Sequence, residues 1–222
     1  MEPIIIKKGV ELELQIESLA YGGKGIAKID NFVIFVKGAI PGQTVKARVY
    51  KKKKGFAEAN TLEVIKESPK AVDVKCDHFG VCGGCKIQNL SYDEQLKEKA
   101  DQVEGAFRRL GGFSDFSLDD SIGADPIFNY RNKMEFTFSN NRWVLHGEPE
   151  DVERDFALGM HIPKRWDKIL NIDECHIQPQ LGNEIINKAR SLAKELKLKP
   201  YDQKTHNGFL RYLLMRFGQN TG

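Results

Sequence analysis

Cysteine and long apolar runs are both scarce in this chain. Only 4 of its 222 residues are cysteine, and no apolar stretch approaches the roughly 20 residues of a membrane-spanning helix. Near the start, the apolar stretch is only Ile4 to Ile6, too short for a secretory signal peptide. The sequence therefore predicts a cytoplasmic protein with no membrane partner, whose thiols stay reduced.

A large excess of either charge is also missing, but the charges are unevenly distributed. The chain has 34 Lys and Arg against 31 Asp and Glu, a net charge of +3. Residues 37–66 hold eight of the basic residues and only two Glu. Such a segment indicates a polyanionic partner, with a solvated basic surface as the alternative.

The first 67 residues carry the pattern of five short strands. Residues 10–17 alternate apolar and charged side chains, the period of a half-buried strand. Asp30 and Asn31 form a good tight-turn pair between two further strands, and residues 44–53 and 57–65 supply the last two. This count predicts a small closed barrel of the OB type over residues 1–67, a fold that often binds nucleic acid.

The last hairpin of this barrel carries a candidate RNA-binding group. Lys51, Lys52, Lys53 and Lys54 stand at its tip, with Phe56 beside them. Lysines neutralise phosphates and an aromatic ring stacks on bases. Phe56 could equally belong to the barrel core.

The remainder combines strands with two amphipathic helices, so the predicted class is α+β, mainly β. Residues 68–90 form a cysteine-bearing loop, and residues 91–112 form a helix that starts with a capping box of Ser91 and Glu94. Residues 113–222 form a β-rich domain containing a second helix. The apolar stripe expected on that helix is Leu181, Ile185, Ala189, Leu192 and Leu196.

Three of the four cysteines lie within ten residues. Cys76, Cys82 and Cys85 are clustered, and Cys175 is remote. A zinc site usually takes two close pairs. Three close thiolates plus a distant one favour an iron–sulfur cluster, and the nearby glycines suit a loop wrapped around one. Zinc remains the alternative.

The cysteine segment resembles a known family. Residues 76–99, CDHFGVCGGCKIQNLSYDEQLKEK, closely resemble the cluster-binding segment of the bacterial 23S ribosomal RNA uracil-5-methyltransferases. Residues 21–49 are similar to the TRAM domain of that family, and YRNKMEF, residues 130–136, to its central domain. A radical S-adenosylmethionine enzyme is disfavoured, because its motif has the spacing Cys-x3-Cys-x2-Cys.

The resemblance implies a function and a set of sites. It implies a TRAM domain that binds ribosomal RNA, S-adenosylmethionine as methyl donor, and a [4Fe–4S] cluster on Cys76, Cys82, Cys85 and Cys175. Arg131 and Lys133 are further candidates for RNA contact. The family's catalytic domain has no counterpart here, so we expect an inactive, monomeric N-terminal portion whose helix 91–112 packs on that domain. The alternative function is a non-catalytic RNA-binding module with a four-cysteine zinc site.

Overall fold

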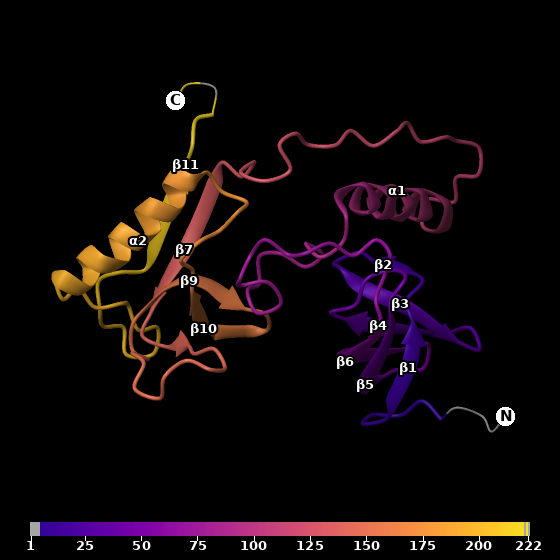
Figure 1. The fold of residues 1–222 in the computed structure, drawn as a ribbon, viewed down its shortest axis with the longest axis horizontal. Coiled ribbons are helices and arrows are strands. Elements are labelled where there is room, and N and C mark those ends of the chain that lie inside the picture. Colours follow the sequence, from indigo (N-terminus) through magenta and orange to yellow (C-terminus); the bar gives the residue numbers. More distant parts are fainter. Residues whose placement is uncertain (1–4, 220, 222) are drawn as a thin grey trace. The chain divides into compact units, whose positions relative to one another are not determined.

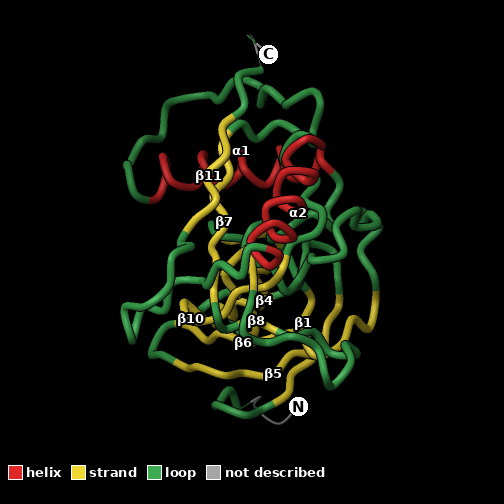
Figure 2. Tube along the Cα trace, turned by 90° about the vertical axis from the view of Figure 1, so that its left-hand side faces the viewer, coloured by secondary structure: helices red, strands yellow, loops and turns green. Residues whose placement is uncertain are grey.

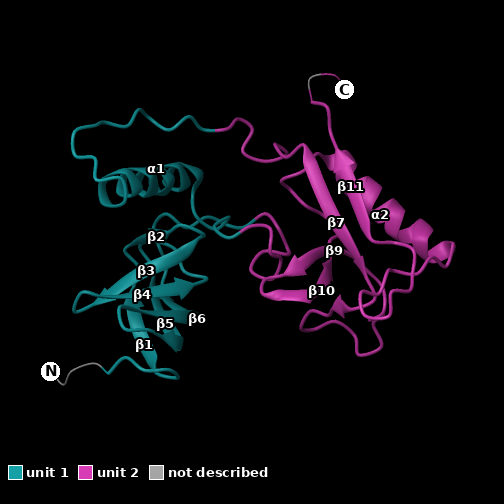
Figure 3. Cartoon of the chain, turned by 180° about the vertical axis from the view of Figure 1, so that it is seen from behind, with its two compact units in different colours: residues 1–74, 86–123 teal, residues 75–85, 124–222 magenta. Residues whose placement is uncertain are grey.

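A computed structural model describes residues 5–219 and 221, and Ile4 lies outside that range. The chain divides into two compact units, each built from separate stretches of sequence (Figure 3). The first comprises residues 1–74 and 86–123, and the second comprises residues 75–85 and 124–222. Strands predominate and two helices accompany them, which confirms the predicted α+β class (Figure 2). Within the described residues, no helix is long and apolar enough to cross a membrane.

The sheet of the first unit has six strands rather than the five expected (Figure 1). Their order in the sheet is β1-β5-β6-β4-β3-β2, so two strands that are consecutive in sequence form its opposite edges and the sheet curls on itself. The extra strand is β2, which follows β1 after Ile16 and Glu17. There the backbone changes partners, because Ile16 N–H donates to Gln43 and Glu17 N–H donates to Ile26. The strands are β1 (Glu11–Gln15), β2 (Ser18–Ala20), β3 (Lys24–Ile29), β4 (Phe32–Lys37), β5 (Thr44–Lys52) and β6 (Phe56–Lys66).

Alternation of side chains along these strands fills the interior of the sheet. In β1, Leu12 and Leu14 are buried while their neighbours are exposed, as the sequence period predicts. The tight turn at Asp30 and Asn31 is confirmed, because both residues have positive φ angles, 48° and 65°. The buried core of this unit is Leu12, Leu14, Ile16, Ala27, Ile34, Val36, Ala39, Val45, Ala47, Val49, Ala57 and Ala59.

Helix α1 (Tyr92–Arg109) begins directly after Ser91, where the sequence places its start. The predicted capping box was nevertheless wrong: among the described residues Ser91 makes no side-chain capping bond. Glu94 instead forms an ion pair of 2.5 Å with Lys70. The carboxylate of Glu94 can either cap the start of the helix or pair with a lysine that is distant in sequence. In this structure it pairs with Lys70.

The second unit is built on a five-stranded sheet in the order β11-β7-β9-β10-β8, with α2 (Gln180–Glu195) packed on it. The buried positions of α2 include Gly182, Ile186 and Ala193, whereas Leu181 and Leu196 are exposed. Ile185 and Ala189 of the predicted stripe pack against the core, whereas Leu192 is exposed as well, so the predicted stripe was confirmed only in part. The strands are β7 (Lys133–Ser139), β8 (Arg142–Trp143), β9 (Ala157–Ile162), β10 (Arg165–Asn171) and β11 (Tyr212–Arg216).

Candidate metal centre and nucleic-acid interface

The cysteine loop belongs to the second unit, although most of its sequence neighbours belong to the first. Tight backbone turns shape it: Phe79 N–H donates to Cys76, and Cys82 N–H donates to the carbonyl of His78 at 2.8 Å. A Cβ atom on Gly83 would lie 2.8 Å from the carbonyl oxygen of His161 in β9. Glycine therefore allows the loop to approach the sheet closely.

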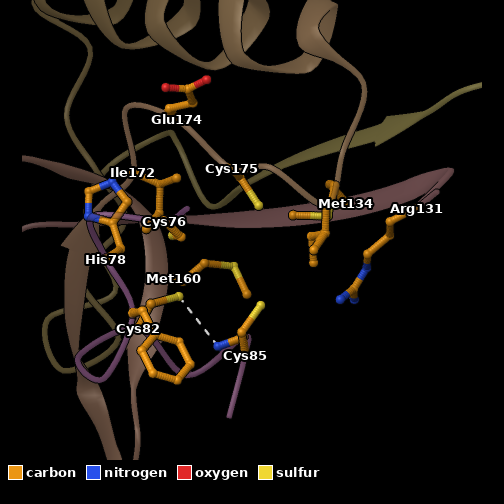
Figure 4. A pocket seen from close by; sticks show the side chains of 13 residues that line it. Cys76, His78, Cys82, Cys85, Arg131, Met134, Met160, Ile172, Glu174 and Cys175 are labelled. Carbon is orange, nitrogen blue, oxygen red and sulfur yellow. Dashed lines mark hydrogen bonds between the residues drawn. The ribbon is translucent and has the colours of Figure 1, made fainter. Parts of the chain in front are cut away.

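The fold brings Cys175 to the same place as the loop cysteines. Cys175 lies between β10 and α2, where its backbone N–H donates to the side chain of Asn183 at 2.9 Å. All four cysteines line one pocket, together with Arg131 and apolar side chains such as Met134 and Met160 (Figure 4). The pocket volume is about 30 Å³. The four cysteines all lie in the described range, and none of them forms a disulfide.

Burial favours the neutral form of three of these thiols, Cys82, Cys85 and Cys175. Desolvation, followed by repulsion from the neighbouring cysteines, raises the pKa of Cys85 to about 11. Desolvation likewise raises the pKa values of Cys82 and Cys175. Hydrogen bonds to sulfur oppose this effect: the N–H of Gly84 donates to Cys82 at 3.3 Å, and backbone N–H groups of Ile177 and Gln178 act on Cys175. A bound cationic centre would be needed to hold four thiolates here.

The pocket holds the ligand types that either the predicted iron–sulfur cluster or the alternative zinc ion would need. Four cysteines with N–H groups directed at sulfur are the usual ligands and neighbours of such a cluster. A zinc ion needs its ligand atoms within one narrow coordination sphere. Among the residues that the structure describes, no group of three or more His, Cys, Asp or Glu side chains is arranged to hold a metal ion. The four cysteines thus line one pocket, and the choice between a cluster and zinc stays a prediction.

The predicted RNA-binding lysines occupy the hairpin between β5 and β6. Lys52, Lys53 and Lys54 are exposed there. Lys51 differs, because it forms an ion pair of 2.6 Å with Glu58 and lies 5.8 Å above the ring of Phe56. Phe56 is half-buried and packs edge-on against Phe35, with 5.6 Å between the ring centres.

Glu58 organises this surface, and no sequence pattern indicated this role. It is only 8% exposed and accepts hydrogen bonds from Lys24, from Lys51, and from the Tyr50 hydroxyl at 2.7 Å. Hydrogen bonds from the two lysines and the tyrosine lower the pKa of Glu58 to about 2. Burial, together with the bond to Glu58, raises the pKa of Tyr50 to about 12. The carboxylate therefore fixes two cations beside the Phe35–Phe56 pair.

Arg131 and Lys133 are placed differently from each other. Arg131 lines the cysteine pocket, and its Nε donates to the carbonyl of Lys133 at 3.1 Å. Lys133 is exposed and lies 3.9 Å from the carboxylate of Glu135. Arg131 thus stands where it can balance negative charge at sulfur.

The fold of the first unit corresponds to a known domain class. Residues 7–62 match the TRAM domain, so the curled sheet is a TRAM domain.

Over the whole chain, similar proteins bear a common name. A protein of Halalkalibacterium halodurans named "uncharacterized RNA methyltransferase" is 36% identical over 217 residues, covering 98% of this chain and 45% of its own length. Another of that name, from Bacteroides thetaiotaomicron, is 40% identical over 201 residues, 89% of this chain and 44% of its own length.

A solved structure agrees with these relatives. The Pyrococcus abyssi tRNA (uracil-54, C5)-methyltransferase, in complex with S-adenosyl-L-homocysteine, has a TM-score of 0.61 and 26% identity. It matches over 94% of this chain and 43% of its own. The chain thus spans a little under half the length of the relatives it matches.

Proposed function

We propose that this chain supplies the RNA-binding surface and a [4Fe–4S] site of an S-adenosylmethionine-dependent RNA uracil-C5 methyltransferase that acts on 23S ribosomal RNA in the cytoplasm. The observation that carries this proposal is the likeness to the Pyrococcus abyssi uracil-C5 methyltransferase over 94% of the chain. The relatives named RNA methyltransferases and the TRAM domain support it.

In this proposal Cys76, Cys82, Cys85 and Cys175 hold the cluster. When bound, the cluster cross-links the loop 75–85 to the segment before α2, so its binding free energy contributes to folding. Arg131 lines the same pocket, and its charge partly opposes the rise that burial causes in the pKa values of Cys85 and Cys175. Backbone N–H groups donate to sulfur and stabilise the thiolate form.

The TRAM domain binds RNA through its basic hairpin. Lys51 to Lys54 contact phosphates, and Glu58 holds Lys51 beside Phe56. Methyl transfer to uracil C5 needs a thiolate that adds to C6, a base that removes the C5 proton, and a site for the sulfonium donor. With all four cysteines at the cluster, we assign none of these parts to the 222 residues here, and we place helix 91–112 as a contact for the domain that carries them.

Two measurements on the anaerobically purified chain test the metal assignment. We expect about four iron and four sulfide per chain and a broad visible absorption from sulfur-to-iron charge transfer. Replacement of Cys175 by Ser should reduce the iron content, whereas replacement of the exposed Ser191 by Ala should leave it unchanged. Zinc in place of iron would support the non-catalytic alternative instead.

Transfer RNA is the second candidate substrate, because the solved relative is named for uracil 54 of tRNA. Competition between a 23S ribosomal RNA transcript and a tRNA transcript for the chain separates the two. Preferential binding of the ribosomal transcript at matched length and salt supports the first candidate, and preferential binding of tRNA replaces it.

A further inference from the structure

Trp166 stands exposed at the wall of a cleft in the second unit. It is 65% exposed, near the start of β10 and two residues after Lys164, whose positive φ of 66° turns the chain between β9 and β10. The cleft that it lines has a volume of about 270 Å³. Tryptophan is usually well covered in folded proteins, so an exposed ring beside a cleft indicates a surface for a ligand.

The other walls of this cleft are polar and held in place by hydrogen bonds. One part of the lining is the end of β7 and its turn, including Thr137 and Asn140, and another is the loop of residues 201–204. The Asn140 side chain joins the two parts, donating to Asp202 at 2.7 Å. Asp202 also accepts from the backbone N–H of Lys204 at 2.7 Å, which fixes the loop. The amides, hydroxyl and carboxylate therefore present donors and acceptors in fixed positions.

A second cleft adjoins the first one. It has a volume of about 490 Å³ and shares Asn140 and Asp202 with the Trp166 cleft. Its lining includes the three lysines Lys194, Lys197 and Lys199 and the three acidic residues Glu153, Asp155 and Asp202. Lys194 is paired with Glu153. Lys197 and Lys199 are exposed lysines of this second cleft, and the exposed Lys204 lines the Trp166 cleft.

We propose that these two clefts bind one unpaired nucleotide of the RNA, with its base stacked on Trp166 and a neighbouring phosphate at Lys197 and Lys199. The inference rests on the proposed RNA-binding function and adds a contact outside the TRAM domain. Pockets for drug-sized ligands have volumes of about 300–1,000 Å³, so the Trp166 cleft suits a single planar heterocycle. An aromatic face, fixed polar groups for the base edge and adjacent cations together match a nucleotide.

A variant with one tryptophan gives a direct reporter. The chain has two tryptophans, Trp143 and Trp166, so Trp143→Phe leaves Trp166 as the only one. Titration with single-stranded oligouridylate should quench its fluorescence as bases stack on the ring. Inorganic polyphosphate supplies the charge without the base and should leave the fluorescence unchanged.

Affinity measurements give the second readout, with labelled oligouridylate followed by fluorescence anisotropy. Trp166→Ala should weaken binding about 10-fold, the loss expected for one stacked base, and Trp166→Phe should recover most of it. Phe209→Ala is the matched control, since Phe209 is 75% exposed in the same unit and lines neither cleft. Equal thermal unfolding of the variants shows that the fold is intact.

The outcomes separate this proposal from the proposed function. Binding of RNA with no quenching, and with the same affinity in Trp166→Ala, overturns the cleft and leaves the TRAM surface standing. Equal quenching by polyphosphate overturns base stacking. Absence of any RNA binding by the unmodified chain overturns both proposals.

Discussion

The carboxylate of Glu98, in α1, accepts a hydrogen bond of 2.7 Å from the backbone N–H of Leu19, in β2. Gln102, one turn further along the helix, donates to the carbonyl of Leu19 at 3.2 Å. β2 is an edge strand of its sheet, so these side chains satisfy backbone groups that a neighbouring strand would otherwise pair. Helix α1 thus covers the edge of the TRAM sheet with its polar side.

Replacing Glu98 by Ala should destabilise the first unit by about 1–3 kcal/mol, because it leaves a buried N–H unsatisfied. Glu98→Gln keeps an acceptor and should cost less. Burial raises the pKa of Glu98, so the folded state favours the protonated carboxyl and this group's contribution falls as pH rises through the raised pKa. Urea unfolding of both variants measures the difference. Equal stability of Ala and Gln variants contradicts the prediction.

Glu58 should give the TRAM domain an acid-sensitive stability. Its folded pKa of about 2 lies below its ordinary value of 4.5, so its contribution is present above about pH 4.5 and is lost as pH falls toward 2. The shift corresponds to an upper limit of roughly 3 kcal/mol. Glu58→Gln should remove this part of the pH dependence in urea unfolding between pH 7 and pH 3. Glu63→Gln, an exposed change on the same strand, serves as control and should leave the pH dependence in place.

Cys82→Ser should destabilise the second unit more than Ser191→Ala does, since cluster binding is also folding free energy. Thermal unfolding of iron-loaded wild type and of each variant, prepared side by side, measures the effect. Equal unfolding temperatures of the wild type and Cys82→Ser, with equal iron content, would refute the cluster assignment.

RNA binding by the basic hairpin should be weak and salt-sensitive. Four phosphate contacts from Lys51 to Lys54 give a log–log salt slope of about −3 for single-stranded RNA, at about −0.7 per contact. Replacing Lys52, Lys53 and Lys54 by Ala should reduce the slope to about −1, leaving the lysine held by Glu58. Lys97→Ala with Lys99→Ala, on exposed positions of α1, is the control. An unchanged slope would move the binding surface to Arg131 and Lys133.

The 222-residue chain should not transfer a methyl group by itself. The reaction needs a nucleophilic thiolate, and all four cysteines line one pocket where the pKa values of Cys82, Cys85 and Cys175 are raised. Transfer of labelled methyl from S-adenosylmethionine to ribosomal RNA, measured with the purified chain, checks this. Methyl transfer above the level measured without protein would mean that one of the four cysteines acts as the nucleophile. It would overturn the assignment of that cysteine to the cluster.

The features that the sequence predicted well depend on residues that are close together in the chain. Alternation in β1 and the positive-φ turn at Asp30 and Asn31 depend on residues next to one another, so the barrel strands were readable. The spacing of Cys76, Cys82 and Cys85 likewise indicated one shared loop, and its role as a ligand-bearing segment stays a prediction. The start of α1 after Ser91 was predicted, whereas its end at Arg109 lies before the predicted residue 112.

Tertiary structure alone decided the rest, because the deciding partners are distant in the chain. Glu58 and Glu98 are charged residues on a strand and a helix, and their burial depends on Lys24 and Leu19, 34 and 79 residues away. The buried side of α2 was set by the sheet beneath it rather than by its most apolar stripe. Cys175 reaches the loop cysteines through the packing of β10 and α2. Trp166 carries no signal in sequence, since only the folded strand shows whether an aromatic ring is covered or left at a cleft.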